Sequence, residues 1–172
     1  MKILAQEERK KHGFTTPRIL RSDLRKVYKT YGIRIDVWPY RLKKVRGAYF
    51  NDADGISVLL NPALPDDPYI FTMAHELKHH LVDSTMSVIY CSDNNETEPI
   101  EIGAEVFAAE LLFPEQDFAD RLTNMRISPG GCTPDILVRL KHETNMRIPV
   151  KSSTESGSCR PVQSEAKLVR SL

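Results

Sequence analysis

The residues with the clearest capacity for chemistry are consecutive: His75-Glu76-Leu77-Lys78-His79, the pattern HExxH. Residues four apart lie on one face of a helix, so both imidazoles can bind one metal ion. Glu76 follows the first ligand and can take a proton from a water at the remaining coordination position. The alternative, two surface histidines on an amphipathic helix, fits less well because the pattern lies inside an apolar run.

A catalytic zinc site needs a third protein ligand, and two downstream acids are candidates. Glu101 and Glu105 are four residues apart, so they share a face of the helix expected over about 98–113. One carboxylate can bind the metal while the other accepts a hydrogen bond from a ligand histidine. The alternative is that both acids are solvated. Because the other residues of this helix are mostly apolar, metal binding is the better explanation.

The other histidines and the cysteines are expected to lie outside the site. His80 points about 100° away from its neighbour around a helix, and His12 is expected to be solvated. The three cysteines are odd in number, widely spaced and without a CxxC pair, which predicts free thiols without a chemical role in a reducing, cytoplasmic compartment. The group that would stabilise an oxyanion is not identified by the sequence, and the candidates are Tyr90 and His142.

The elements that must position these residues follow from hydrophobic periodicity and from chain breakers. Apolar residues at helical spacing predict helices over 17–31, about 68–82, 98–113, 116–125 and 134–144. Alternation predicts a strand over 33–38, and two short apolar runs around the turn-rich segment 51–55 predict a hairpin of 47–50 and 56–60. Asp67 is expected to cap the HExxH helix with Pro68 at its first position, and residues 83–97 are expected to be a loop.

Length and composition fit one α+β domain. The chain has 172 residues, of which 41% are hydrophobic and 27% charged. No apolar run is long enough to span a membrane, and charge follows the first residues too soon for a signal peptide. Residues 1–16 are an N-terminal segment that can be flexible, 17–145 form the domain, and 146–172, rich in Ser, Thr and Lys, are expected to be a disordered tail.

Charge is distributed unevenly along the chain although the net charge is only +1. Residues 1–46 hold 14 Lys and Arg against 4 Asp and Glu, a net of +10. Residues 47–120 hold 1 against 15, a net of −14, and residues 121–172 hold 9 against 4, a net of +5. Two interpretations are open: an electrostatic role in binding a partner, or complementary faces that meet inside the fold.

The two motifs together resemble the ImmA/IrrE family of zinc metallopeptidases. That family has HExxH followed by a helix with the pattern E-x-x-A-N/D-x-F-A-A-x-L-L-M-P, and residues 101–114 read EIGAEVFAAELLFP. The resemblance extends over roughly residues 15 to 145. It departs from the pattern at Glu105, where the family has Asn or Asp, and at Phe113, where it has Met.

The resemblance implies a small zincin-like domain in which a short antiparallel sheet packs on the HExxH helix and on a second ligand-bearing helix. By it, His75, His79 and Glu101 would bind Zn2+, Glu76 would be the general base, and Glu105 would support a ligand. It also implies an endopeptidase whose protein partner is a helix-turn-helix transcriptional repressor. Two alternatives stay open: a metal-binding regulator without catalysis, and a nucleic-acid-binding protein that uses the basic helix 17–31.

Overall fold

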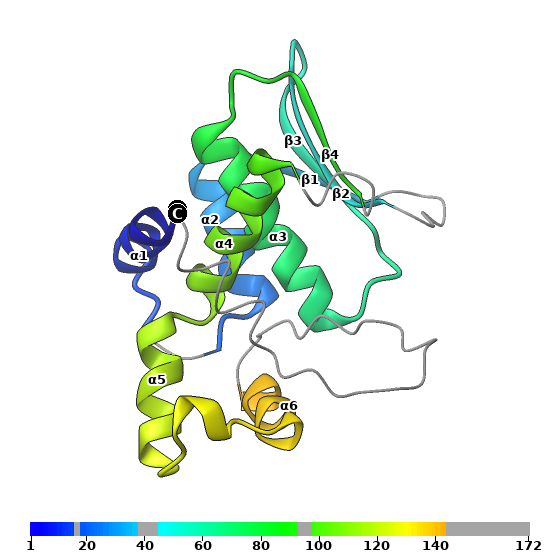
Figure 1. Ribbon diagram of the computed structural model, residues 1–172. Coiled ribbons are helices and arrows are strands. Elements are labelled where there is room, and N and C mark those ends of the chain that lie inside the picture. Colours follow the sequence, from blue (N-terminus) through cyan, green and yellow to red (C-terminus); the bar gives the residue numbers. More distant parts are fainter. Residues whose placement is uncertain (16–17, 38–44, 93–97, 144–172) are drawn as a thin grey trace.

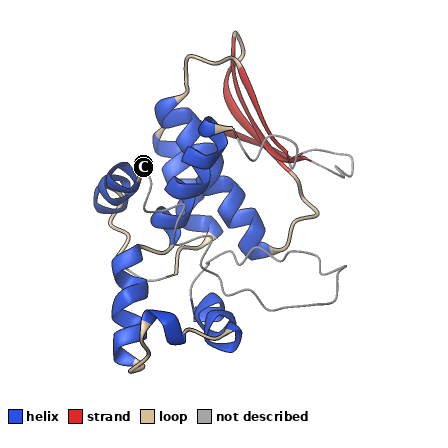
Figure 2. Ribbon diagram, in the orientation of Figure 1, coloured by secondary structure: helices blue, strands red, loops and turns tan. Residues whose placement is uncertain are grey.

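The computed structural model describes residues 1–15, 18–37, 45–92 and 98–143. They form an α+β domain in which the helices gather on one side and the sheet covers the other (Figures 1 and 2). In chain order its elements are α1 (Lys2–Lys11), α2 (Arg21–Thr30), β1 (Arg34–Val37), β2 (Val45–Asp52), β3 (Gly55–Leu60), α3 (Asp66–Val82), β4 (Val88–Ser92), α4 (Pro99–Leu112), α5 (Glu115–Asn124), the 3-10 turn η1 (Pro129–Gly131) and α6 (Pro134–Glu143).

The sheet has the strand order β1-β3-β2-β4. The predicted hairpin is confirmed as β2 and β3, which pair antiparallel out to Asp52 and Gly55, where Gly55 has a φ of 106° that favours glycine. The sheet is mixed, and not wholly antiparallel as expected, because β1 pairs parallel with β3. The expectation of a loop over 83–97 is wrong at β4, which pairs antiparallel with β2 and lies at the sheet edge.

Helix α3 is the centre of the domain. Residues 69–79 are all buried, because the sheet, α2 and α4 pack around it. The helix begins at Asp66, so Asp67 lies in its first turn and is not the cap that the sequence predicted. Polar contacts join α2 to α3: Arg21 pairs with Asp66 at 3.0 Å, and the Tyr28 hydroxyl donates to the Met73 carbonyl at 2.7 Å.

Residues 1–16, which the sequence analysis left outside the domain, contribute helix α1 to it. Ala5 is fully buried where α1 packs on α4 (Figure 1). The guanidinium of Arg9 donates to the Leu111 carbonyl, and Gln6 Nε2 donates to Glu110 Oε1 at 2.7 Å. The first helix is therefore part of the packed unit. The expected tail over 146–172 lies outside the described residues.

The uneven charge is partly explained by contacts within the fold. Arg18 and Arg21, from the basic first part of the chain, pair with Asp67 and Asp66 at the start of α3. These two arginines belong to the basic segment on which the nucleic-acid interpretation depended.

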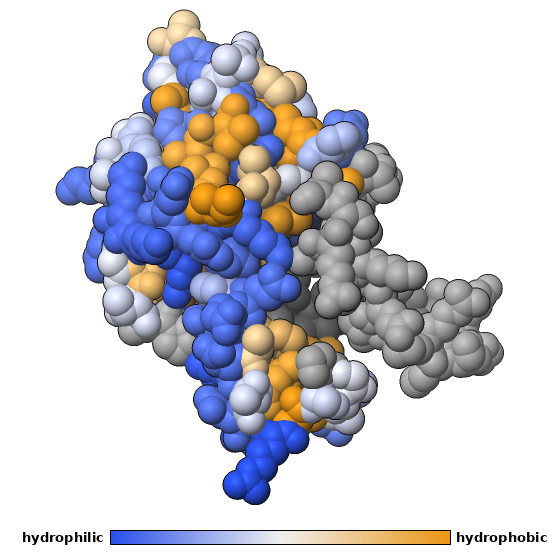
Figure 3. Space-filling model, turned by 60° about the vertical axis from the view of Figure 1, so that its left-hand side comes forward, coloured by the Kyte–Doolittle hydropathy of each residue, from blue (hydrophilic) through white to orange (hydrophobic). Residues whose placement is uncertain are grey.

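Figure 3 shows one face of the molecule, where a broad hydrophilic region separates two groups of hydrophobic side chains. Among the described helices, none is long and apolar enough to cross a membrane.

Candidate active site

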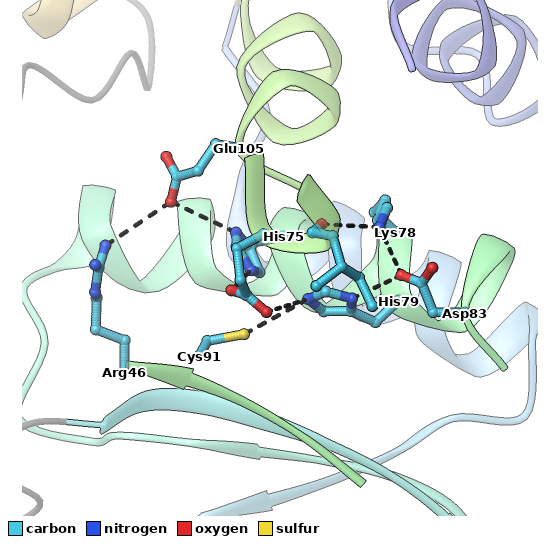
Figure 4. Close-up of polar contacts among 9 residues, drawn as sticks. Arg46, His75, Lys78, His79, Asp83, Cys91 and Glu105 are labelled. Atoms are coloured by element: carbon cyan, nitrogen blue, oxygen red, sulfur yellow. Dashed lines mark hydrogen bonds and ion pairs between the residues drawn. The ribbon is translucent and has the colours of Figure 1, made fainter. Parts of the chain in front are cut away.

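Four possible metal-binding side chains converge at the contact of three elements. His75 and His79 come from α3, Glu101 from the first turn of α4 and Cys91 from β4, and one ligand atom from each lies within 4.8 Å of all the others. All four side chains are buried. Figure 4 shows His75, His79 and Cys91 directed toward one another between the two helices and the sheet. Helical spacing explains the two histidines, whereas the other two donors arrive through tertiary packing.

The Glu101 carboxylate lies between the two imidazoles. Its Oε2 is 3.1 Å from His75 Nε2 and its Oε1 is 3.6 Å from His79 Nε2. Glu101 Oε1 is buried and has no hydrogen-bond partner among the described residues. A buried carboxylate with an unsatisfied oxygen is costly unless a cation binds it. Two imidazoles, a carboxylate and a thiol are also donor types that zinc prefers, so the residues fit a divalent metal.

His79 is held by a carboxylate that the sequence analysis missed. Asp83, just past the end of α3, accepts a hydrogen bond from His79 Nδ1 at 2.8 Å. The carboxylate can only accept, so Nδ1 carries the hydrogen and the Nε2 lone pair faces the cluster. Burial and the charge of His75 lower the pKa of His79 to about 4, so it is neutral at ordinary pH.

The buried Lys78 ties this arrangement to α4. Its ammonium donates to Asp83 Oδ2 at 2.6 Å and to the Ile100 carbonyl at 2.9 Å. It therefore neutralises Asp83 and joins the end of α3 to the start of α4, next to Glu101 (Figure 4). A signal for Asp83 was present in the sequence, because it lies four residues after His79. No local pattern indicated the role of Lys78.

His75 has an acid on each side of its ring. Its Nδ1 is 3.5 Å from Glu105 Oε1, and its Nε2 faces Glu101. Burial alone would lower the pKa of His75, but the two carboxylates outweigh it and raise the pKa to about 9. The metal-free site therefore holds a proton where a metal would bind. Glu105 lies where the sequence analysis expected an acid that supports a ligand.

Glu76 is fully buried, and neither of its carboxylate oxygens has a hydrogen-bond partner among the described residues. Burial raises its pKa to about 7, against the opposing charge of His75. Strand β2 passes directly over it at Gly47. A Cβ at position 47 would collide with Glu76 Oε1 and lie 2.7 Å from Thr72 Cγ2. Any larger residue at position 47 would therefore force the Glu76 and Thr72 side chains to move.

A cleft with about 310 Å³ of empty space, open solvent included, leads to the cluster. Arg46 lines it beside Glu105, with 3.9 Å between its guanidinium and Oε1 of that acid. The pairing of β2 with β4 is irregular between Val45 and Gly47, so Arg46 lies at a bulge, a feature that redirects side chains next to active sites. The residues lining the cleft are Arg46, Phe71, Thr72, His75, Cys91, Glu101 and Glu105.

The remaining candidates from the sequence are separated from the cluster or lie beyond the described residues. Tyr90 alternates with Cys91 along β4, is 56% exposed, and its ring packs edge-on against Phe50. The expectation that His80 is not a ligand agrees with its place against Tyr49, whose hydroxyl is 3.4 Å from Nδ1. The side chain of His142 and all of Cys159 lie outside the described residues.

One expectation about a single side chain is wrong. His12 is not solvated, because its ring packs against Phe14 and its Nε2 lies 3.2 Å from Glu8. Cys91 was expected to have no chemical role, and the structure places its thiol among the four buried side chains that could hold a metal ion. Its strand is short and lies between polar residues, so periodicity could not show which way the thiol points.

Comparison with protein-family models identifies the family. Residues 29–129 match the model of Peptidase_M78, described as the IrrE N-terminal-like domain. The match covers more than half of the chain and includes every residue of the cluster. The chain belongs to this family. The predicted resemblance is thereby confirmed, and membership indicates a metallopeptidase that acts on protein. No curated protein matches the chain significantly.

Proposed function

We propose that the protein is a zinc-dependent endopeptidase in which His75, His79 and Glu101 hold the metal and Glu76 is the general base. The observation that carries this proposal is the Glu76 carboxylate, fully buried beside the ligands with both oxygens unpartnered. A site that only bound a metal would need no such group. Zinc is proposed over manganese or iron because of the ligand types.

A divalent metal in this site supplies a Lewis acid that polarises the scissile carbonyl and acidifies water. Glu76 takes the proton from the attacking water and delivers it to the leaving amine. Its pKa of about 7 suits both transfers near neutral pH. His75 is kept in position by Glu105 and His79 by Asp83. Arg46 is our candidate for the cation that stabilises negative charge on the carbonyl oxygen, since it lines the cleft.

The sheet edge favours an extended peptide as substrate. Strand β4 is the last strand of the sheet, and one of its residues, Cys91, lines the cleft. A peptide that paired with the outer edge of β4 would extend the sheet and run past the cluster. This arrangement suits cleavage within a chain, because neither end of the substrate has to be bound.

The proposed substrate is a helix-turn-helix transcriptional repressor, as the resemblance implies. In its support, residues 47–120, which contain Glu76 and all four possible metal-binding side chains, have a net charge of −14. Acidic residues around the site would favour encounter with a basic DNA-binding protein. Cleavage of such a repressor should then slow as ionic strength rises, while cleavage of a neutral peptide should not. Equal salt dependence for both substrates would contradict electrostatic recognition.

The test is cleavage of a peptide library by the zinc-loaded protein, with new peptide ends identified by mass spectrometry. Glu76→Gln should keep its zinc but lose cleavage by about a hundredfold or more, because the ligands remain while the base is lost. Glu115→Gln, which changes an exposed acid outside the cluster, is the control and should cleave normally. Undiminished cleavage by Glu76→Gln would overturn the mechanism. Absence of cleavage both by the unmodified protein and by a variant that lacks the cleft-lining thiol of Cys91 would favour the alternative of a metal-binding regulator.

A further inference from the structure

Cys91 stands apart from the other donors because the proposed mechanism does not use it. Its Sγ is 3.7 Å from His79 Nε2, which in turn is 3.6 Å from Glu101 Oε1. In a tetrahedral zinc site with metal–nitrogen bonds of about 2.0 Å and metal–sulfur bonds of about 2.3 Å, neighbouring donors are about 3.3–3.6 Å apart. The thiol is therefore close to the distance of a ligand from His79, and its Sγ lies within 4.8 Å of a ligand atom of each other donor.

Two independent observations indicate that a cation binds here. Glu101 Oε1 is buried without a hydrogen-bond partner among the described residues, although it faces the same space as the thiol. Both oxygens of the Glu76 carboxylate are also buried, and the Cys91 thiol is a donor that acts on this carboxylate in the metal-free site. One metal ion among these groups would compensate the acidic charge that the cluster buries.

The cleft shows how the thiol is placed relative to the base. Cys91 lines the cleft together with His75 and Glu101, whereas Glu76 is not among the lining residues. A catalytic zinc site keeps one coordination position open toward the substrate, and a structural site fills all four. Here a thiol is one of the three donors of the cluster that line the cleft.

We propose that Cys91 is a fourth protein ligand of the metal and fills the position that catalysis requires to be open. The thiol releases its proton to solvent as it binds, because the thiolate is the ligand. The loaded site is then closed at rest and opens when Cys91 leaves the metal. The edge position of β4, with β2 as its described partner, allows this movement. The ligand assignment stands alone, whereas the closure rests on the proposed peptidase function.

X-ray absorption of the zinc-loaded protein tests the assignment without any substrate. The unmodified protein should show one sulfur at about 2.3 Å beside nitrogen and oxygen at about 2.0 Å. Cys91→Ala should lose the sulfur contribution, and Cys132→Ala, which removes a half-buried thiol outside the cluster, should keep it. The cobalt-loaded protein should show a thiolate charge-transfer band that disappears only in Cys91→Ala. A loaded protein without a sulfur ligand would overturn the assignment, whether or not the variants fold.

Cleavage of the same peptide library tests the closure. Cys91→Ala, or Cys91→Ser if alanine impairs folding, should cleave at least about tenfold faster than the unmodified protein at equal zinc content. Equal rates would overturn the closure. A sulfur ligand in a protein that never cleaves, even as Cys91→Ala, would leave the ligand assignment standing and remove the peptidase function. Glu76-dependent cleavage by a protein without a sulfur ligand would leave the peptidase function standing and remove the ligand assignment.

Discussion

Glu76 is expected to destabilise the metal-free protein above neutral pH, and Glu76→Gln is expected to relieve this. Burial raises the pKa of Glu76 from its ordinary value of 4.5 to about 7. Between these two values the folded protein keeps the proton that the unfolded chain has released. The free energy of unfolding contributed by this group therefore falls as pH rises from 4.5 to about 7 and stays low above it.

The magnitude follows from the interval between the two pKa values. From 4.5 to about 7 is about 2.5 units, and one unit corresponds to about 1.36 kcal/mol, which gives about 3 kcal/mol. The side chain is fully buried, so solvent does not screen the effect. Glutamine has the shape of the protonated side chain and no charge. The variant should therefore match the unmodified protein near pH 4.5 and exceed its stability by about 3 kcal/mol above pH 8.

Urea unfolding in the presence of a chelator, repeated from about pH 5 to about pH 8, measures this difference. Other titrating groups are common to both proteins and largely cancel in the comparison. Glu115→Gln serves as the control, because its carboxylate is exposed and the stability difference should not depend on pH in this range. A stability difference for Glu76→Gln that stayed constant with pH, or that favoured the unmodified protein at high pH, would refute the reasoning.

Three further substitutions separate the roles of the surrounding residues. Gly47→Ala should keep its metal but lose about a hundredfold or more in peptide cleavage, because the new Cβ displaces the Glu76 carboxylate; normal cleavage would show that the close approach is unimportant. Asp83→Asn should lower metal affinity by about 10–100-fold, measured by competition with a chelator, because His79 loses its charged acceptor; unchanged affinity would contradict this support. His79→Ala should lose its metal in plasma emission analysis, and normal stoichiometry would refute the ligand assignment.

The part of the site that sequence could predict is the part fixed by local geometry. His75 and His79 share a helix face at any position in a fold, and Glu101 with Glu105 does the same on the second helix. The resemblance to the family then assigned residues of both helices to one metal site. Cys91 could not be assigned in this way, because its place depends on how an edge strand packs over α3, and that is decided by contacts distant in sequence.

In the fold, too, elements with a local sequence signal were predictable, and elements that depend on distant contacts were not. The hairpin was predictable because a turn-rich segment separates two apolar runs. The N-terminal helix was not, since α1 buries Ala5 and charged side chains such as Arg9, and its charged sequence is typical of a solvated segment. The parallel pairing of β1 with β3 also had no local signal, because β2 lies between these two strands in the chain and their pairing depends on contacts distant in sequence.

A metal that only joined α3, α4 and β4 would explain His75, His79, Cys91 and Glu101, but not Glu76. Both of its oxygens are buried, and the charge costs about 3 kcal/mol at the pH where the carboxylate is ionised. A side chain that is not a metal ligand and destabilises the protein is retained where it takes part in a reaction. Gly47 supports the same conclusion, because β2 gives up a side chain there to make room for Glu76. Of the two metal-binding interpretations, catalysis is therefore the one that accounts for Glu76.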